Sequence, residues 1–303
     1  MSIIFGPIHS RRFGKSLGID LSPSKKQCNF DCLYCELDPA KTMAGQDEVL
    51  SVSEVIGAIE EALKSHHDID VLTITANGEP TLYPHLSELI DEINRIKGDT
   101  RTLILSNAST IHKPDVQKAL AKLDEVKLSL DCATQRCLKR LDRSHSGIDV
   151  SDIKEGMLQF KAHYKGALIV EVLMVEGLND TPEEIAELNA YLRKLKPTRI
   201  DMGTIDRPPA FDVKPLSYER LLAVAQQFDA SLPLYIASRK KAEVRPSSYN
   251  EEAILETLAK RPLSEDDIVA LFDEKTQQRF EALKKRGKIK AVETNGIIFY
   301  KKC

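Results

Sequence analysis

The feature that most constrains this fold is a regular alternation of β-rich and helical stretches between residues 16 and 236. The expected strands are SLGIDL (16–21), DVLTIT (70–75), RTLILS (101–106), EVKLSL (125–130), ALIVEVLMV (167–175), TRIDMGTI (198–205) and LPLYIA (232–237). The expected helices lie near 52–65, 84–97, 113–122, 151–162, 182–195 and 217–228. This alternation predicts βαβ units with a mostly parallel sheet. Six or seven units favour an α/β fold built on a full or partial barrel over a small doubly wound sheet.

A different pattern begins after residue 245 and predicts a second, smaller domain. The expected division is a barrel over 1–240, a linker over 241–248 and a small domain over 249–303. The small domain begins with three helical patterns, at 250–260, 264–272 and 274–288. Two β runs joined by Asn295-Gly296 follow, and this dipeptide is typical of a hairpin turn. Three helices followed by a hairpin predict a winged-helix module.

Charge is unevenly distributed in this small domain. The whole chain has a net charge of −3, which excludes a globally basic nucleic-acid binder. Residues 249–274 hold two basic and eight acidic residues, whereas residues 275–303 hold nine basic and two acidic residues. A nucleic-acid-contacting surface would therefore lie on the third helix and the hairpin. Protein docking is the alternative role for such a module.

The cellular compartment is predicted from two features that the sequence does not show, a membrane span and a secretory signal. No window approaches the ~18 consecutive apolar residues of a membrane span. The first residues, MSIIFGPIHSRRFGKSLG, have no apolar core of a secretory signal. We therefore expect a cytoplasmic protein that does not contact a membrane. In a reducing compartment, the clustered members of its six cysteines are metal ligands or catalytic groups more often than disulfides.

Three cysteines form the sharpest local motif, because Cys28, Cys32 and Cys35 follow the first expected strand in a C-x3-C-x2-C run. A structural zinc site would need a fourth ligand, and His9 is the nearest upstream candidate. Iron–sulfur clusters normally take four cysteines, so three would leave one iron open to bind another molecule.

This cysteine run at the exit of a first barrel strand resembles the radical S-adenosylmethionine (SAM) superfamily. The resemblance implies that Cys28, Cys32 and Cys35 are the metal ligands and hold a 4Fe–4S cluster. It further implies that the open iron chelates SAM, which one electron cleaves to methionine and a 5′-deoxyadenosyl radical. No catalytic residue is assigned beyond the cluster ligands. A flavodoxin or ferredoxin is the kind of reductant implied.

Further stretches match SAM-binding elements of that superfamily in order and position. Asn77-Gly78-Glu79-Pro80 resembles its Gly-Glu-Pro element, where backbone and glutamate receive the SAM amino group. Polar residues at two later strand ends would face the ribose hydroxyls or the methionine carboxylate, because such ends point into a barrel mouth. These residues are Ser106, Asn107, Ser129 and Asp131. Gly203 is expected in the backbone segment that pairs with adenine, and Tyr34 is expected to pack on it.

The entry segment narrows the resemblance further: Gly6-Pro7-Ile8-His9-Ser10-Arg11-Arg12-Phe13-Gly14-Lys15-Ser16-Leu17-Gly18. Together with Asp206-Arg207-Pro208-Pro209 it is similar to the wyosine-synthase-related group, whose members of known function modify tRNA. RNA, most specifically tRNA, is therefore the expected substrate. The extra cysteines of wyosine enzymes are missing before Cys28, so the particular reaction stays open. A peptide-modifying radical SAM enzyme and an iron–sulfur DNA-binding regulator are the alternatives.

Several other residues have open roles. The basic residues of the first 27 positions would either hold a phosphate over the barrel mouth or form a solvated arm. They are Arg11, Arg12, Lys15, Lys25 and Lys26. Arg207 is a candidate for a substrate carboxylate or phosphate, and His145 for proton transfer. One of Glu171 and Glu176 should face into the barrel. The roles of Cys132, Cys137 and Cys303, and the oligomeric state, stay undetermined.

Overall fold

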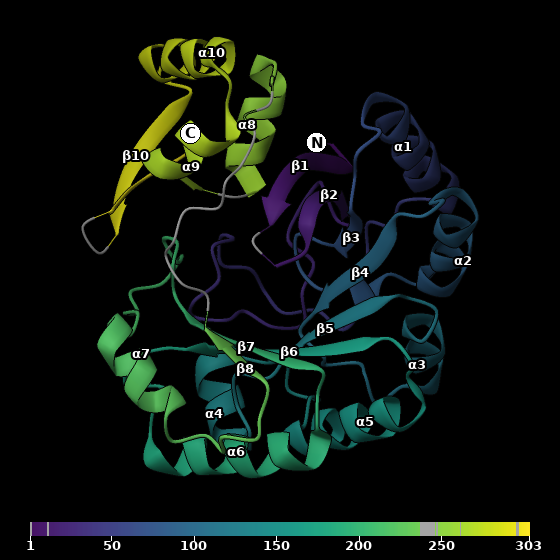
Figure 1. Cartoon of the computed structure of the whole chain (residues 1–303), viewed down its shortest axis with the longest axis vertical. Helices are drawn as coiled ribbons and strands as arrows, with labels where there is room; N and C mark the ends of the chain where they lie inside the picture. Colours follow the sequence, from purple (N-terminus) through teal and green to yellow (C-terminus); the bar gives the residue numbers. More distant parts are fainter. Residues whose placement is uncertain (1, 11, 237–245, 247, 261, 295–296) are drawn as a thin grey trace.

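One eight-stranded sheet forms the main body of the molecule, with its strands in chain order from β1 to β8 (Figure 1). The computed structural model describes residues 2–10, 12–236, 246, 248–260, 262–294 and 297–303. The strands are β1 (Ile4–Ser10), β2 (Gly14–Asp20), β3 (Val71–Thr75), β4 (Arg101–Ser106), β5 (Glu125–Ser129), β6 (Ala167–Met174), β7 (Arg199–Thr204) and β8 (Leu234–Ile236). All pairs from β2 to β8 are parallel, which confirms the expected α/β class.

Helices connect the parallel strands and cover the outer face of the sheet (Figure 1). They are α1 (Val52–Ser65), α2 (Leu86–Ile96), α3 (Pro114–Leu120), α5 (Val150–His163), α6 (Pro182–Leu195) and α7 (Tyr218–Ala225). Two shorter elements, α4 (Gln135–Cys137) and the π-helical turn η2 (Leu138–Asp142), follow β5. Local signals fix the helix starts: Ser51 and Glu54 form a capping box ahead of α1, and Thr181 caps α6.

The sheet is an open, partial barrel. Within the described residues, β1 and β8 are its two edges and do not pair with each other. The main hydrophobic core fills the layer between the sheet and the outer helices. The concave side is accessible, because Leu105 of the central strand β4 is 37% exposed although helices cover the opposite face.

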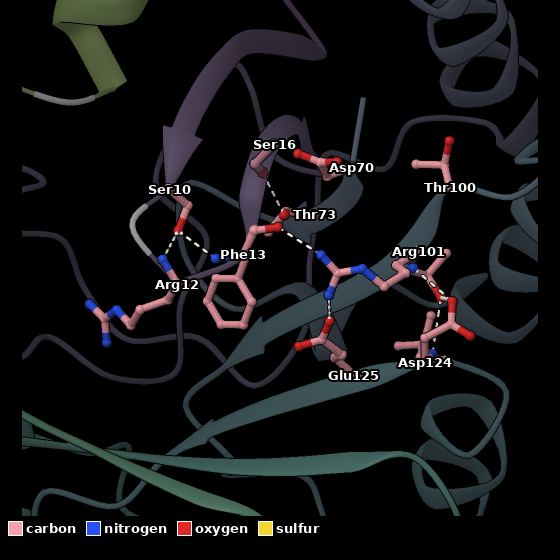
Figure 2. Close-up of polar contacts among 12 residues, drawn as sticks. Ser10, Arg12, Phe13, Ser16, Asp70, Thr73, Thr100, Arg101, Asp124 and Glu125 are labelled. Carbon is pink, nitrogen blue, oxygen red and sulfur yellow. Dashed lines mark hydrogen bonds and ion pairs between the residues drawn. The ribbon is translucent and has the colours of Figure 1, made fainter. Parts of the chain in front are cut away.

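The first strand is an element that the sequence did not predict. β1 pairs with β2 in an antiparallel hairpin, with Ser10 opposite Gly14. The hairpin turn brings Phe13 against Val71, Leu103 and Ile169, at or near the starts of the parallel strands. Figure 2 shows the turn held by Ser10, which accepts hydrogen bonds from the backbone of Arg12 and Phe13. Phe13 thus fills the end of the barrel at which the parallel strands begin.

The last part of the chain, residues 249–303, forms a compact unit that we call the C-terminal module. It comprises α8 (Glu251–Lys260), β9 (Leu263–Ser264), α9 (Glu265–Leu271), α10 (Glu274–Lys285), β10 (Ile289–Thr294) and β11 (Ile297–Lys302). Its three strands form a separate antiparallel sheet in the order β10-β11-β9. A second hydrophobic core, which includes Phe272 and Phe280, lies between this sheet and the helices. Asn295-Gly296 and most of the expected linker lie outside the described residues.

None of the described helices has the length and apolar character needed to span a bilayer.

Candidate functional site

The loop that carries the three clustered cysteines lies between β2 and α1, at the end where the parallel strands terminate. Its starting point is fixed by Gln27, whose side chain is completely buried. The backbone N–H of Gln27 donates to the carbonyl of Asn77 (2.8 Å), and the carbonyl of Gln27 accepts from Glu79 (3.0 Å). These bonds form an isolated parallel bridge beyond the ends of β2 and β3. Cys28 is thereby joined to the turn after β3.

Gly78 is the residue that permits this close approach. Its backbone has a φ of +138°, a conformation that side-chain-bearing residues rarely adopt. A Cβ at this position would also overlap the carbonyl of Gln27. The glycine of the Asn77-Gly78-Glu79-Pro80 element is therefore required by the backbone itself.

Two N–H groups point at the sulfur of Cys28. The backbone N–H of Phe30 lies 3.4 Å from this sulfur, and the amide Nδ2 of Asn107 lies 3.7 Å from it. Asn107 also donates to the side chain of Asn29 (2.9 Å), which fixes its orientation. N–H donors favour the thiolate form that binds metal.

A neighbouring loop holds the segment that contains Cys32 and Cys35. Asp31 and Leu33 donate their backbone N–H groups to the carbonyls of Asp142 and Leu141 in η2. On the other side, Ala210 donates to the carbonyl of Cys35 (2.8 Å). The cysteine loop is therefore held between the η2 turn and the loop after β7.

The three thiols share an environment that disfavours ionisation unless a cation is bound. Burial and the charge of Glu79 raise the pKa of Cys28 to about 12. Burial likewise raises the pKa of Cys32, with Asp142 adding to the effect, and it raises the pKa of Cys35. A positively charged metal centre would compensate for these unfavourable thiolates. The donor set thus fits a metal group.

The spacing of the sulfurs favours a cluster over a single ion. Zn–S bonds of about 2.3 Å place the sulfurs of a tetrahedral zinc site roughly 3.8 Å apart. Within the described residues, Cys28, Cys32 and Cys35 do not form a group with ligand atoms all within 4.8 Å of one another. At least one pair of these sulfurs is therefore more than 4.8 Å apart, wider than the sulfur spacing around one zinc ion.

Glu79 uses its carboxylate to join the ends of β3 and β4. It accepts hydrogen bonds from the hydroxyl of Ser106 (2.7 Å) and the backbone N–H of Asn107 (2.7 Å). It also accepts from the backbone and hydroxyl of Thr81. Burial raises the pKa of Glu79. With its side chain so engaged, Glu79 shapes this turn, and Ser106 supports it from the next strand.

Asp131 and Tyr34 form a second polar contact in the site. Asp131 accepts a hydrogen bond from the Tyr34 hydroxyl and another from the backbone N–H of Leu173 (2.7 Å). The Tyr34 hydroxyl also lies 3.4 Å from Asp142. Burial raises the pKa of Asp131 to about 7. Tyr34, expected to pack on adenine, thus has its hydroxyl anchored on a carboxylate.

A narrow cleft brings together four of the residues predicted from the sequence. Tyr34, Asn107, Ser129 and Asp131 all line it, and Asp142 completes one side. Asn77 and Gly78 are half-buried in the turn after β3, and Pro80 is buried at the start of η1 (Pro80–Leu82). Gly203 lies on β7 with open space where a side chain would begin.

The basic residues near the N-terminus do not form an open phosphate site in the described part of the chain. Arg12 pairs with Asp201 (2.8 Å) and Glu171 (3.4 Å) inside the barrel, and Lys127 joins the same acids. The other lysines are also paired, Lys15 with Asp68, Lys25 with Asp47 and Glu48, and Lys26 with Asp31. The described cations of this segment are thus paired with acids of the same chain, buried ones for Arg12 and Lys26 and exposed ones for Lys15 and Lys25. Arg11 and the side chain of His9 lie outside the described residues.

The remaining candidates have mixed outcomes. Glu171 faces into the barrel and Glu176 is exposed, as expected. His145 lies in the loop after η2, and its backbone N–H donates to the carbonyl of Asn29 (2.8 Å). Arg207 contacts protein groups rather than an open surface. Cys132 and Cys137, whose roles the sequence left open, form a buried disulfide. Cys303 is exposed.

Sequence reasoning missed the residues that hold the site together. Gln27 and Asn29 are buried and organise the cysteine loop. The only signal in the sequence was that these two residues flank Cys28, because a single amide side chain does not form a recognisable motif. Asn179 was also missed, and its side chain donates to the carbonyl of Asp131 (2.8 Å).

The fold and the cysteine loop define a class of protein: a partial α/β barrel with a three-thiol cofactor site at the strand ends. The sequence profile of the Radical SAM superfamily matches residues 23–191. The chain belongs to this superfamily, whose enzymes use a 4Fe–4S cluster and SAM. It is therefore a radical SAM enzyme.

Individual relatives and solved structures agree with this membership. A "UPF0026 protein" of Helicobacter pylori is 42% identical over 302 residues, covering 98% of this chain and 97% of that protein. The UPF0026 protein MJ1312 of Methanocaldococcus jannaschii is 31% identical, covering 100% of this chain and 96% of that protein. A radical SAM methyltransferase from Sphaerobacter thermophilus has a similar fold (TM-score 0.55, 17% identity, 74% of this chain and 67% of that chain).

Gly78→Ala should damage the site. The new methyl group overlaps the Gln27 carbonyl, so we expect a loss of about 2–4 kcal/mol in unfolding free energy. The amount of iron and sulfide that this variant binds after anaerobic reconstitution should also fall. Gly57→Ala is the matched control, because this helix α1 residue has open space around it. It should stabilise the chain by about 0.5–1 kcal/mol. Urea unfolding that ranked the two variants equally would contradict this account.

The raised pKa of Asp131 predicts a pH-dependent stability in the iron-free protein. Between about pH 4 and 7 the unfolded carboxyl is ionised while the folded one is protonated, so stability falls as pH rises. The effect is at most about 4 kcal/mol, and Asp131→Asn should remove it.

Asp124 provides a control in which the dependence of stability on pH has the opposite sign. Partial burial raises its pKa, but hydrogen bonds from Lys97 and Thr102 outweigh that and lower it overall. Asp124→Asn should therefore remove a stabilisation that is lost as pH falls. Urea titrations from about pH 2 to 8 cover both windows, because the Asp124 effect lies below about pH 4, and an unchanged slope in Asp131→Asn would refute the prediction.

Proposed function

We propose that Cys28, Cys32 and Cys35 are the ligands of the 4Fe–4S cluster and that SAM binds against the strand ends next to them. The three sulfurs lie in one loop, and two N–H donors are aimed at Cys28. When bound, the cluster supplies the electron that cleaves SAM to methionine and a 5′-deoxyadenosyl radical.

This chain's own residues orient SAM and exclude water. The Asn77-Gly78 backbone offers groups for the SAM amino group, with Glu79 holding the turn in place. Asn107, Ser129 and Asp131 provide polar groups at neighbouring strand ends for the ribose and methionine parts. Tyr34 closes the cleft through its bond to Asp131. Gly203 leaves room on β7 for the adenine.

Cys32→Ala tests the cluster assignment. We expect the wild-type protein, reconstituted anaerobically and reduced with dithionite, to produce 5′-deoxyadenosine from SAM, and the variant to lose this product at least 100-fold (roughly 3 kcal/mol). Cys303→Ala is the control, since this exposed cysteine is in the last position and outside the loop. Chromatography of the products measures both. Equal yields from Cys32→Ala and the wild type would overturn the assignment.

We infer that the substrate is RNA, most specifically tRNA. The observation that carries this proposal is a group of lysines on the C-terminal module that we call the basic patch: Lys285, Lys288, Lys290, Lys301 and Lys302. Within the described residues none of the five has an ion-pair partner, whereas the N-terminal lysines are all paired. Unpaired cations that are close together are typical of phosphate contacts.

The local structure explains why these lysines are close together. Helix α10 ends at Lys285, and Lys288 precedes β10 directly. The hairpin register then places Lys290 opposite Lys301. Side chains paired across two strands lie on the same face, so the repulsion between them is tolerated only where solvent or a counter-charge is present. An RNA backbone would supply that counter-charge.

The element order of the module supports its interpretation as a winged helix, with α10 and the β10–β11 hairpin as its contact elements. The peptide-modifying alternative would use the same module for docking. A tRNA substrate also fits the resemblance of the Ser10–Phe13 and Asp206–Pro209 segments to tRNA-modifying enzymes. Reductive cleavage of SAM needs a low-potential electron, which fits a cytoplasmic protein that receives electrons from a flavodoxin or ferredoxin.

Reversing the charge of the basic patch should weaken RNA binding. For Lys285→Glu, Lys288→Glu and Lys290→Glu combined, we expect at least a roughly tenfold loss of affinity for bulk tRNA at low salt. The slope of log K against log salt should fall by about one for each lysine that contacts a phosphate. Fluorescence anisotropy at 50–300 mM salt measures both quantities.

A matched variant separates this effect from net charge. Lys64→Glu, Lys118→Glu and Lys194→Glu change three exposed lysines on α1, α3 and α6 by the same amount. These changes should leave most of the affinity and the salt slope in place. If both triple variants bind tRNA alike, or if the wild type binds a peptide pool with no salt dependence, the RNA proposal fails.

A further inference from the structure

The C-terminal module contacts the barrel on both sides of its open part. On one side, the Tyr249 hydroxyl donates to the carbonyl of Pro7 in β1 (2.8 Å), and α8 packs beside this strand (Figure 1). On the other side, Nε of Arg207, in the loop after β7, donates to the carbonyl of Pro262 (3.2 Å). The module therefore reaches from one sheet edge to the loop at the far side.

The loop that carries Arg207 follows the last part of β7. Strand β8 (Leu234–Ile236) pairs with Ile200–Met202 of β7. Gly203 and Thr204, at the end of β7, pair with Leu173 and Met174 of β6. This end of β7 lies near the strand ends that carry the proposed cofactor site, so the loop after it can contact both that site and the module.

Arg207 contacts both the C-terminal module and the cysteine loop. Besides the carbonyl of Pro262, its guanidinium lies 3.9 Å from the carboxylate of Glu36, the residue that follows Cys35. The carboxylate of Asp267 in α9 also acts on this guanidinium from the module, and the Arg207 side chain is only 20% exposed. The same loop donates from Ala210 to the carbonyl of Cys35. One short segment thus joins the module to the third cysteine.

A second contact strengthens this connection without involving the module. Phe211 lies under the guanidinium of Arg143, 4.7 Å from its ring centre. Arg143 in turn pairs with Asp31, between the first two cysteines (3.5 Å). The loop after β7 therefore supports the cysteine loop at two points, and Arg207 is the one that also contacts the module.

We propose that Arg207 is a positioning residue that couples docking of the C-terminal module to the conformational stability of the cysteine loop. With the module in place, Pro262 and Asp267 hold the guanidinium against Glu36. If the module moves away, Arg207 loses two of its partners and the loop around Cys35 loses support. A macromolecule that binds the module would then influence the cofactor site through one side chain.

The test uses two single variants and their combination. Arg207→Gln removes the charge and the contact with Glu36. Tyr249→Phe removes only a hydroxyl, on the opposite side of the module, and this hydroxyl does not touch the cysteine loop within the described contacts. Under the proposal both variants loosen the same loop. Arg193→Gln and Tyr218→Phe are the matched controls on exposed helix positions.

Hydrogen exchange of the iron-free chain is the first readout. We expect Arg207→Gln and Tyr249→Phe each to raise exchange several-fold in peptides that cover residues 29–43, and the controls to leave it unchanged. The second readout is a SAM titration of the reduced, reconstituted protein by EPR. Here SAM affinity should fall about three- to tenfold in Arg207→Gln, and the double variant should lose less than the two singles combined.

A different pattern would overturn the proposal. If Tyr249→Phe raises exchange in the module at residues 251–272 but leaves residues 29–43 as in the wild type, the module and the cysteine loop are not coupled. Strictly additive losses of SAM affinity would lead to the same conclusion. Thermal unfolding of each variant identifies any that fails to fold. No nucleic acid enters these measurements, so the outcome is independent of the RNA proposal.

Discussion

The contact on which the site depends is the backbone pairing between Gln27 and the turn at Gly78. It is an isolated parallel bridge, offset from the β2–β3 register, and it places Cys28 directly beside the Glu79 turn. The buried Gln27 side chain then receives the backbone of Asp47 and Glu48, which closes the rest of the loop. Because this bridge joins the two segments, its loss would separate Cys28 from the Glu79 turn.

Buried charge is arranged differently in the two halves of the barrel. Near the strand starts, Arg12 and Lys127 neutralise Asp201, and these contacts help keep the pKa of Asp201 low despite burial. Near the strand ends, burial leaves Asp131 and the three thiols with raised pKa values. The first arrangement stabilises the fold by itself, whereas the second becomes favourable when a cationic group is bound. This contrast places the chemistry at one end of the sheet.

Much of the fold could be predicted because its signals are local. The 3.6-residue and alternating patterns located the parallel strands and main helices, and Ser51 and Thr181 marked helix starts. Strand β1 was missed because its residues, including Pro7 and Gly6, do not alternate like a strand. In the site, motifs located the cysteines and the Gly-Glu-Pro turn. They did not indicate that Glu79 bonds to Ser106, or that Tyr34 bonds to Asp131, since those partners are distant in sequence.

The sequence by itself determined the class of fold, the three-cysteine loop and the superfamily, because spacing and periodicity are properties of neighbouring residues. Tertiary structure alone decided the partners of each charged group. Arg12 and Arg207 read as free cations in the sequence, yet folding places Arg12 beside Asp201 and Arg207 between Glu36 and Pro262. Electrostatic interactions depend on distance in space, and the pattern of residues along the chain does not specify that distance.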